Sequence, residues 1–148
     1  MTADQGTGLE RRSPSQNRLT GLVASRNETL ALYAELARLR PFTDEPFTAE
    51  ALQQFCEALI DYTASAHFQL YRYVAERRER RVAVRDVAER IYPRISVITE
   101  STLAFNDRYA VADLNECLPT LVDDLSRLGE ELADRIQLED QLIDALIG

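Results

Sequence analysis

The chain has 148 residues, of which 45% are hydrophobic and 28% are charged, a composition typical of one soluble globular domain. All 17 basic residues are arginine, and 25 acidic residues set the formal net charge at −8, which argues against nucleic acid as the main ligand. The lack of lysine excludes Schiff-base chemistry, and the single histidine, His67, cannot complete a di-iron or multi-histidine zinc site. We therefore expect no metal and no other cofactor.

The N-terminal residues are polar, and no apolar run reaches the roughly 18 residues that a membrane span needs. The sequence therefore predicts neither a membrane protein nor a secreted one, and we expect it in the cytoplasm. Cys56 and Cys117 show no CxxC spacing, so both are expected as buried free thiols. We predict a flexible leader over residues 1–14 and a single domain over residues 15–148.

Apolar residues recur at spacings of three and four nearly throughout, without strand-like alternation, which predicts an all-α protein. The first helix is expected over residues 15–40, because Pro41 blocks its continuation. A second helix is expected to start at Thr48 as N-cap, and its apolar stripe runs through His67 to Val74.

The third helix carries its apolar stripe from Val84 to Tyr109. Pro93 falls inside this stripe and is expected to kink the helix without ending it, because the apolar register continues past it. The fourth helix is expected to begin near residues 116–118, since Pro119 suits a first turn. Four amphipathic helices with short connections predict an antiparallel four-helix bundle.

The charge is unevenly distributed along the chain. Residues 113–148 hold ten acidic residues and two arginines, whereas residues 72–94 hold eight arginines and four acidic residues. A solvated helix face is the simplest interpretation of the acidic segment. The alternative is that one face of the bundle attracts a basic partner, because complementary potentials raise the rate of association.

The sequence offers little for catalysis. Glu139 and Asp140 could form an acid–base pair, but adjacent residues on a helix point in different directions. His67 interrupts an apolar stripe and is expected as a buried, hydrogen-bonded imidazole. Cys56 lies about three turns before it, too far for a thiol–imidazole pair. Nucleotide-loop and metal-ligand spacings are also absent, so we expect a protein that acts by binding and has no enzymatic activity.

Residues 55–71 read FCEALIDYTASAHFQLY. This stretch resembles a helix of the Rsd/AlgQ family with the pattern F-C-x-x-L-x-D-Y-x-S-A-G-H-F-x-x-Y. Further similarity follows in the right order at residues 91–94 (IYPR), at residues 99–108 (TESTLAFNDR), which are especially close to the AlgQ branch, and at residues 138–143 (LEDQLI).

The resemblance implies a four-helix bundle that regulates transcription as an anti-sigma factor. Such proteins bind the C-terminal, promoter-recognising domain of the primary sigma factor, keep it from the promoter and from core polymerase, and so favour alternative sigma factors in stationary phase. It also implies that Asp61 pairs with an arginine of the sigma domain, that Phe68 makes an aromatic contact, and that Ala64 replaces an interface serine. The implied partner-binding residues are Asp61, Ala64, Ser65, Phe68, Tyr71 and Arg72.

The spacing of Asp61, Ala64 and Phe68 at three and seven predicts that they share one helix face. Arg72 stands where the family has glutamate. A second hypothesis, which is a known role of some family members, is an adaptor for a phosphotransfer or other signalling protein, through residues 77–85 or the acidic fourth helix. A third hypothesis, an enzyme or a cofactor-binding bundle, would require a bound metal or chromophore.

Overall fold

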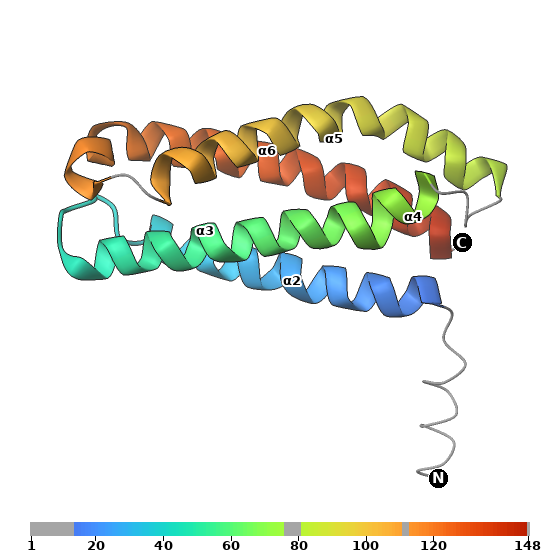
Figure 1. Cartoon of the computed structure of the whole chain (residues 1–148), viewed down its shortest axis with the longest axis horizontal. Helices are drawn as coiled ribbons and strands as arrows, with labels where there is room; N and C mark the ends of the chain where they lie inside the picture. Colours follow the sequence, from blue (N-terminus) through green and yellow to red (C-terminus); the bar gives the residue numbers. More distant parts are fainter. Residues whose placement is uncertain (1–13, 76–80, 111–112, 148) are drawn as a thin grey trace, which may run out of the picture.

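The computed structural model describes residues 14–75, 81–110 and 113–147. Within these residues it is an all-α antiparallel bundle, as predicted: successive helices run in opposite directions (Figure 1). Each helix packs on its neighbours in the chain, and contacts between the last helix and the first close the ring. The long helices are α2 (Pro14–Ala37), α3 (Pro46–Ala66), α5 (Val82–Tyr109) and α6 (Leu114–Ile147).

Helix α2 ends three residues earlier than predicted. After Ala37 the α-helical hydrogen bonding gives way to a tighter turn, in which the amide of Leu39 donates to the carbonyl of Leu36 at 3.0 Å. Pro41 follows in the connection to α3. Of the predicted leader, residues 1–13 lie outside the described part of the chain.

The prediction of Thr48 as the N-cap of the second helix is wrong. The capping position belongs to Glu45, whose backbone is extended, and Pro46 occupies the first helical position. Proline suits that position because its missing amide hydrogen would have no partner there. Thr48 lies inside the first turn and is fully buried.

A π-helical turn, η1 (His67–Tyr71), follows α3 directly and leads into the short helix α4 (Arg72–Ala75). A π turn holds one more residue than an α turn and therefore changes which side chains face the interior. Ala66, Leu70 and Tyr71 are buried here, whereas His67 is exposed. The prediction of a buried His67 imidazole is therefore wrong, because the regular spacing from which it was drawn ends at this turn.

Helix α5 continues through Pro93, as predicted. Helix α6 begins earlier than predicted, at Leu114, because Asp113 caps it. The carboxylate of Asp113 accepts a hydrogen bond from the amide of Asn115 at 3.0 Å, and its carbonyl accepts one from the amide of Glu116 at the same distance.

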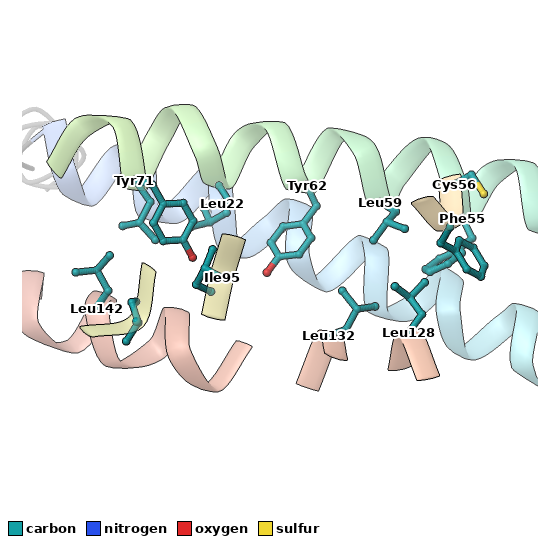
Figure 2. Packing of buried hydrophobic residues seen from close by; sticks show 14 of the residues in the cluster. Leu22, Phe55, Cys56, Leu59, Tyr62, Tyr71, Ile95, Leu128, Leu132 and Leu142 are labelled. Carbon is teal, nitrogen blue, oxygen red and sulfur yellow. The ribbon is translucent and has the colours of Figure 1, made fainter. Parts of the chain in front are cut away.

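The apolar core lies along the axis of the bundle. Figure 2 shows Phe55 and Leu59 of α3 pointing toward Leu128 and Leu132 of α6. The Phe55 ring also meets Phe105 of α5 edge-on, at 6.0 Å between centroids. Cys56 and Cys117 are buried free thiols, as predicted.

Helices α2 and α6 approach closely at Gly129. The hydroxyl of Tyr33 donates to the carbonyl of Leu125 at 2.9 Å, and a Cβ atom on Gly129 would lie 2.2 Å from that hydroxyl. Glycine is therefore the residue that fits here without moving Tyr33.

Candidate partner-binding face and the polar core behind it

Most of the predicted partner-binding residues lie on the outer surface of α3 and η1. Asp61 and Ala64 are exposed, Ser65 is partly buried, and Phe68 keeps 51% of its surface exposed. The carboxylate of Asp61 forms no ion pair with any residue that the structure describes. We call Asp61, Ala64, Ser65, Phe68 and Arg72 the α3 face.

The α3 face separates two hollows. Asp61 lines a hollow of about 230 Å³ toward α2, beside Ser25 and Glu28. Ala64 and Phe68 line a hollow of about 380 Å³ toward α5. The structure therefore brings Ala64 and Phe68 together at one groove and places Asp61 at the neighbouring one.

Tyr71 and Arg72 differ in exposure although they are adjacent. Tyr71 is only 5% exposed and belongs to the interior, so we leave it out of the face on which the resemblance placed it. Arg72 is exposed, and its guanidinium carbon lies 5.6 Å from the centre of the Phe68 ring. The edge of the His67 ring meets the same aromatic ring at 4.9 Å between centroids. Phe68 is thus held by an arginine and an imidazole.

The hollow between α3 and α5 has a second wall that the sequence did not reveal. Tyr92 and Leu103 of α5 are 48% and 45% exposed, and both line it. Both residues lie inside motifs quoted for the resemblance, but outside the apolar stripe of the third helix. An apolar residue that belongs to such a motif but not to the buried stripe was the signal in the sequence that could have indicated this wall. We call this space the α3–α5 hollow. Its lining includes Ile60, Ala64, Phe68, Tyr92, Ser96 and Leu103, and its buried floor is formed by Tyr71, Ile95 and Arg135.

A cluster of buried polar side chains lies behind this hollow. The Glu139 carboxylate is fully buried and accepts hydrogen bonds from the hydroxyl of Tyr62, from the hydroxyl of Tyr71 at 3.3 Å and from Nε of Arg135 at 3.0 Å. Figure 2 shows the hydroxyls of Tyr62 and Tyr71 pointing into the bundle. Arg26 of α2 lies 3.7 Å from Glu139. We call Tyr62, Tyr71, Arg135, Glu139 and Arg26 the polar core.

The charges of the polar core are balanced with the help of Asp140, which lies next to it and is half exposed. Nη1 of Arg26 donates to Asp140 at 2.9 Å, and Nη1 of Arg135 donates to Thr99 of α5 at 2.9 Å. Two arginines therefore face two carboxylates, which is the arrangement that makes buried charge tolerable. Burial and then the charge of Glu139 raise the pKa of Tyr62, so its phenol stays a protonated donor.

This cluster was not predicted, because Glu139 and Asp140 were interpreted only as an adjacent acid pair. The available signal was the four-residue spacing of Arg135 and Glu139, which occupy core positions of the stripe that runs from Leu132 to Leu142. Among the residues that the structure describes, no group of three or more histidine, cysteine or acidic side chains could hold a metal ion.

The hypothesis of an adaptor surface over residues 77–85 falls partly on residues 76–80, which lie outside the described part of the chain. Beside that gap, Arg81 donates to the carbonyl of Leu146 at 2.8 Å and so ties the start of α5 to the end of α6. No described helix combines the length and the apolar character that crossing a membrane requires.

The chain was compared with known proteins. The family described as "Regulator of RNA polymerase sigma(70) subunit, Rsd/AlgQ" matches residues 5–147. Proteins named "Regulator of sigma D" from Yersinia enterocolitica and Yersinia pseudotuberculosis are 32% identical to it over 123 residues, which covers 80% of this chain and 74% and 73% of theirs. The protein of that name from Salmonella typhi is 27% identical over 139 residues, which covers 91% of this chain and 85% of its own. No solved structure matches the chain significantly. With a family match over nearly its whole length, the chain belongs to the Rsd/AlgQ family of regulators of the RNA polymerase sigma(70) subunit.

Proposed function

We propose that this protein is a cytoplasmic anti-sigma factor that binds the C-terminal, promoter-recognising domain of the primary sigma factor. The observation that carries the proposal is an exposed carboxylate, Asp61, with no ion-pair partner among the described residues, on the same face as the half-exposed ring of Phe68 two turns further along, in a bundle of this family. A charged group without an internal partner and an exposed aromatic side chain on one face are typical of a binding hot spot.

The charge of α3 supports a basic partner. This helix carries Glu50, Glu57 and Asp61, all exposed, and contains no arginine. A domain that reads promoter DNA needs a basic surface for its phosphate contacts. The acidic α3 surface is complementary to such a domain, and this complementarity speeds association and fixes the orientation of the complex.

The proposed mechanism is occlusion. The bound chain covers the basic surface of the sigma domain, so that this surface can meet neither promoter phosphates nor core polymerase. No covalent step is involved, and the extent of inhibition depends on the amount of chain and on its affinity. Because the carboxylates lie at the surface, we expect salt to weaken the complex.

The test is a binding titration between the full chain and the isolated C-terminal sigma domain. Asp61→Arg replaces an attractive charge with a repulsive one, and we expect it to weaken binding by about 2 kcal/mol or more, roughly 30-fold. Glu50→Arg is the matched control: it makes the same charge change on the same helix about three turns away, so it measures the general electrostatic attraction without the contact at Asp61, and we expect a smaller loss. The proposal fails if no complex forms at micromolar concentration, or if Asp61→Arg binds as well as Glu50→Arg.

A further inference from the structure

We infer that the α3–α5 hollow receives a large apolar side chain of the sigma domain, and that Tyr92 and Leu103 of α5 determine the specificity of the complex. This inference rests on the proposed function. It extends the interface from the α3 face to a second helix, which neither the resemblance nor the family assignment indicated.

Three exposed apolar side chains meet at this hollow. Phe68, Tyr92 and Leu103 are 51%, 48% and 45% exposed, and all three line it. Single exposed apolar residues are normal on a protein surface, whereas several around one concavity mark an interaction site. The volume of about 380 Å³ falls within the range of roughly 300–1,000 Å³ that is typical of binding cavities.

The polar groups of the hollow that are buried or partly buried are already bonded, which favours an apolar occupant, whereas His67, Ser96 and Tyr92 are exposed residues of its lining. The hydroxyl of Thr63 donates to the carbonyl of Leu59 at 2.7 Å, and that of Thr99 donates to the carbonyl of Ile95 at 2.9 Å. The guanidinium of Arg135 at the floor is paired with Glu139 at 3.0 Å. A charged ligand group would have to compete with these bonds, whereas an aliphatic or aromatic side chain leaves them intact.

The charge around the hollow indicates which other side chain the docking segment carries. Asp61 lies seven residues before Phe68, about 10 Å along the helix axis; α3 itself carries no basic residue, and Arg72 lies over the Phe68 ring at the other end of the face. A docking segment that engages both sites therefore presents an arginine and, about 10 Å away, a large apolar side chain. An amphipathic basic helix meets this requirement, since residues about two turns apart lie on the same face.

The test uses the same titration with the C-terminal sigma domain. Tyr92→Ala and Leu103→Ala are expected to weaken binding at least tenfold, because each removes part of the apolar wall. Val97→Ala is the matched control: Val97 is also on α5 and 49% exposed, but it does not line the hollow, and we expect less than a twofold effect. Leu103→Met keeps the apolar volume and should bind within threefold of the parent chain. Thermal melting of each variant verifies that the fold is kept.

The outcomes separate the two proposals. If Tyr92→Ala and Leu103→Ala both bind like the parent while Asp61→Arg does not, this inference is wrong and the proposed function stands. If Val97→Ala weakens binding as much as they do, the hollow is not the determinant and the inference also fails. If the parent chain does not bind the sigma domain, the proposed function fails and this inference fails with it.

Discussion

Asp61 and Glu139 carry the same chemical group on long helices of one bundle, but their surroundings are opposite. Glu139 is fully buried, and three side chains donate hydrogen bonds to its carboxylate. Asp61 is exposed and has no cationic partner in the described part of the chain. The interior carboxylate is bonded within the fold, and the surface carboxylate is free for another molecule.

The two regions meet at the α3–α5 hollow. Tyr71 and Arg135 form its floor, and both are also bonded to Glu139. The proposed binding surface is thus built on side chains whose positions are fixed from the inside. Positioning of this kind lowers the loss of conformational freedom on binding, because the floor is ordered before the partner arrives.

The largest effect is expected when the polar core loses its carboxylate. Glu139→Leu leaves the guanidinium of Arg135 buried without its carboxylate and removes the acceptor of both tyrosines. We expect the free energy of unfolding to fall by about 3–5 kcal/mol, since an unpaired buried charge is strongly destabilising. Urea denaturation of the parent chain and the variant at neutral pH measures this difference in the free energy of unfolding.

The matching control replaces both members of the pair. Arg135→Met with Glu139→Leu removes the two opposite charges together, and Arg26 keeps Asp140 as its partner. Apolar pairs of similar volume often replace a buried ion pair at little cost, but the hydroxyls of Tyr62 and Tyr71 still lose their acceptor, so we expect the double variant to recover only part of the lost stability. A single Glu139→Leu variant that loses less than about 1 kcal/mol would contradict the assigned role of the polar core.

The predictable part of the fold came from apolar spacing. The stripe from Val84 to Tyr109 and the two buried cysteines were predicted because burial of apolar surface is the strongest signal in a sequence. The exposed position of His67 was not predicted, because the π turn at His67–Tyr71 shifts the register and no composition rule anticipates it. Thr48 failed as N-cap because Pro46 fits the first turn better.

The candidate site was predicted in part. The resemblance supplied Asp61 and Phe68, and the structure places both at the surface. Glu139, Arg135 and Leu103 were missed because their surroundings depend on contacts with other helices, which the spacing along a single helix indicates only in part. A charged residue in an apolar stripe indicates a buried partner without saying on which helix that partner lies.

Alkaline pH is expected to have a smaller effect per pH unit, which also arises from groups in the interior. Burial raises the pKa of the Cys56 thiol to about 12, and burial with the charge of Glu139 raises the pKa values of Tyr62 and Tyr71. Above about pH 9 the unfolded chain releases protons that the folded chain keeps. Stability should therefore fall as pH rises, by up to about 1.4 kcal/mol per pH unit for each ionising group.

Urea denaturation between pH 8 and pH 11 tests this dependence. Cys56→Ala should remove the contribution of the thiol, which begins at the lowest pH because unfolded cysteine ionises before unfolded tyrosine. Below about pH 8 these three groups should contribute no slope. Constant stability up to pH 11 would show that the three side chains are not held in a protonated state by the fold.

The smallest effect on stability is expected at the surface. Asp61→Ala removes an exposed carboxylate that has no ion-pair partner among the described residues, and alanine favours helix more than aspartate does. We expect the free energy of unfolding to change by no more than about 0.5 kcal/mol. The same variant should weaken binding of the sigma domain, so stability and binding separate at Asp61 while Glu139→Leu changes stability most. A marked loss of stability in Asp61→Ala would mean that this carboxylate serves the fold, and the contrast between the two acids would not hold.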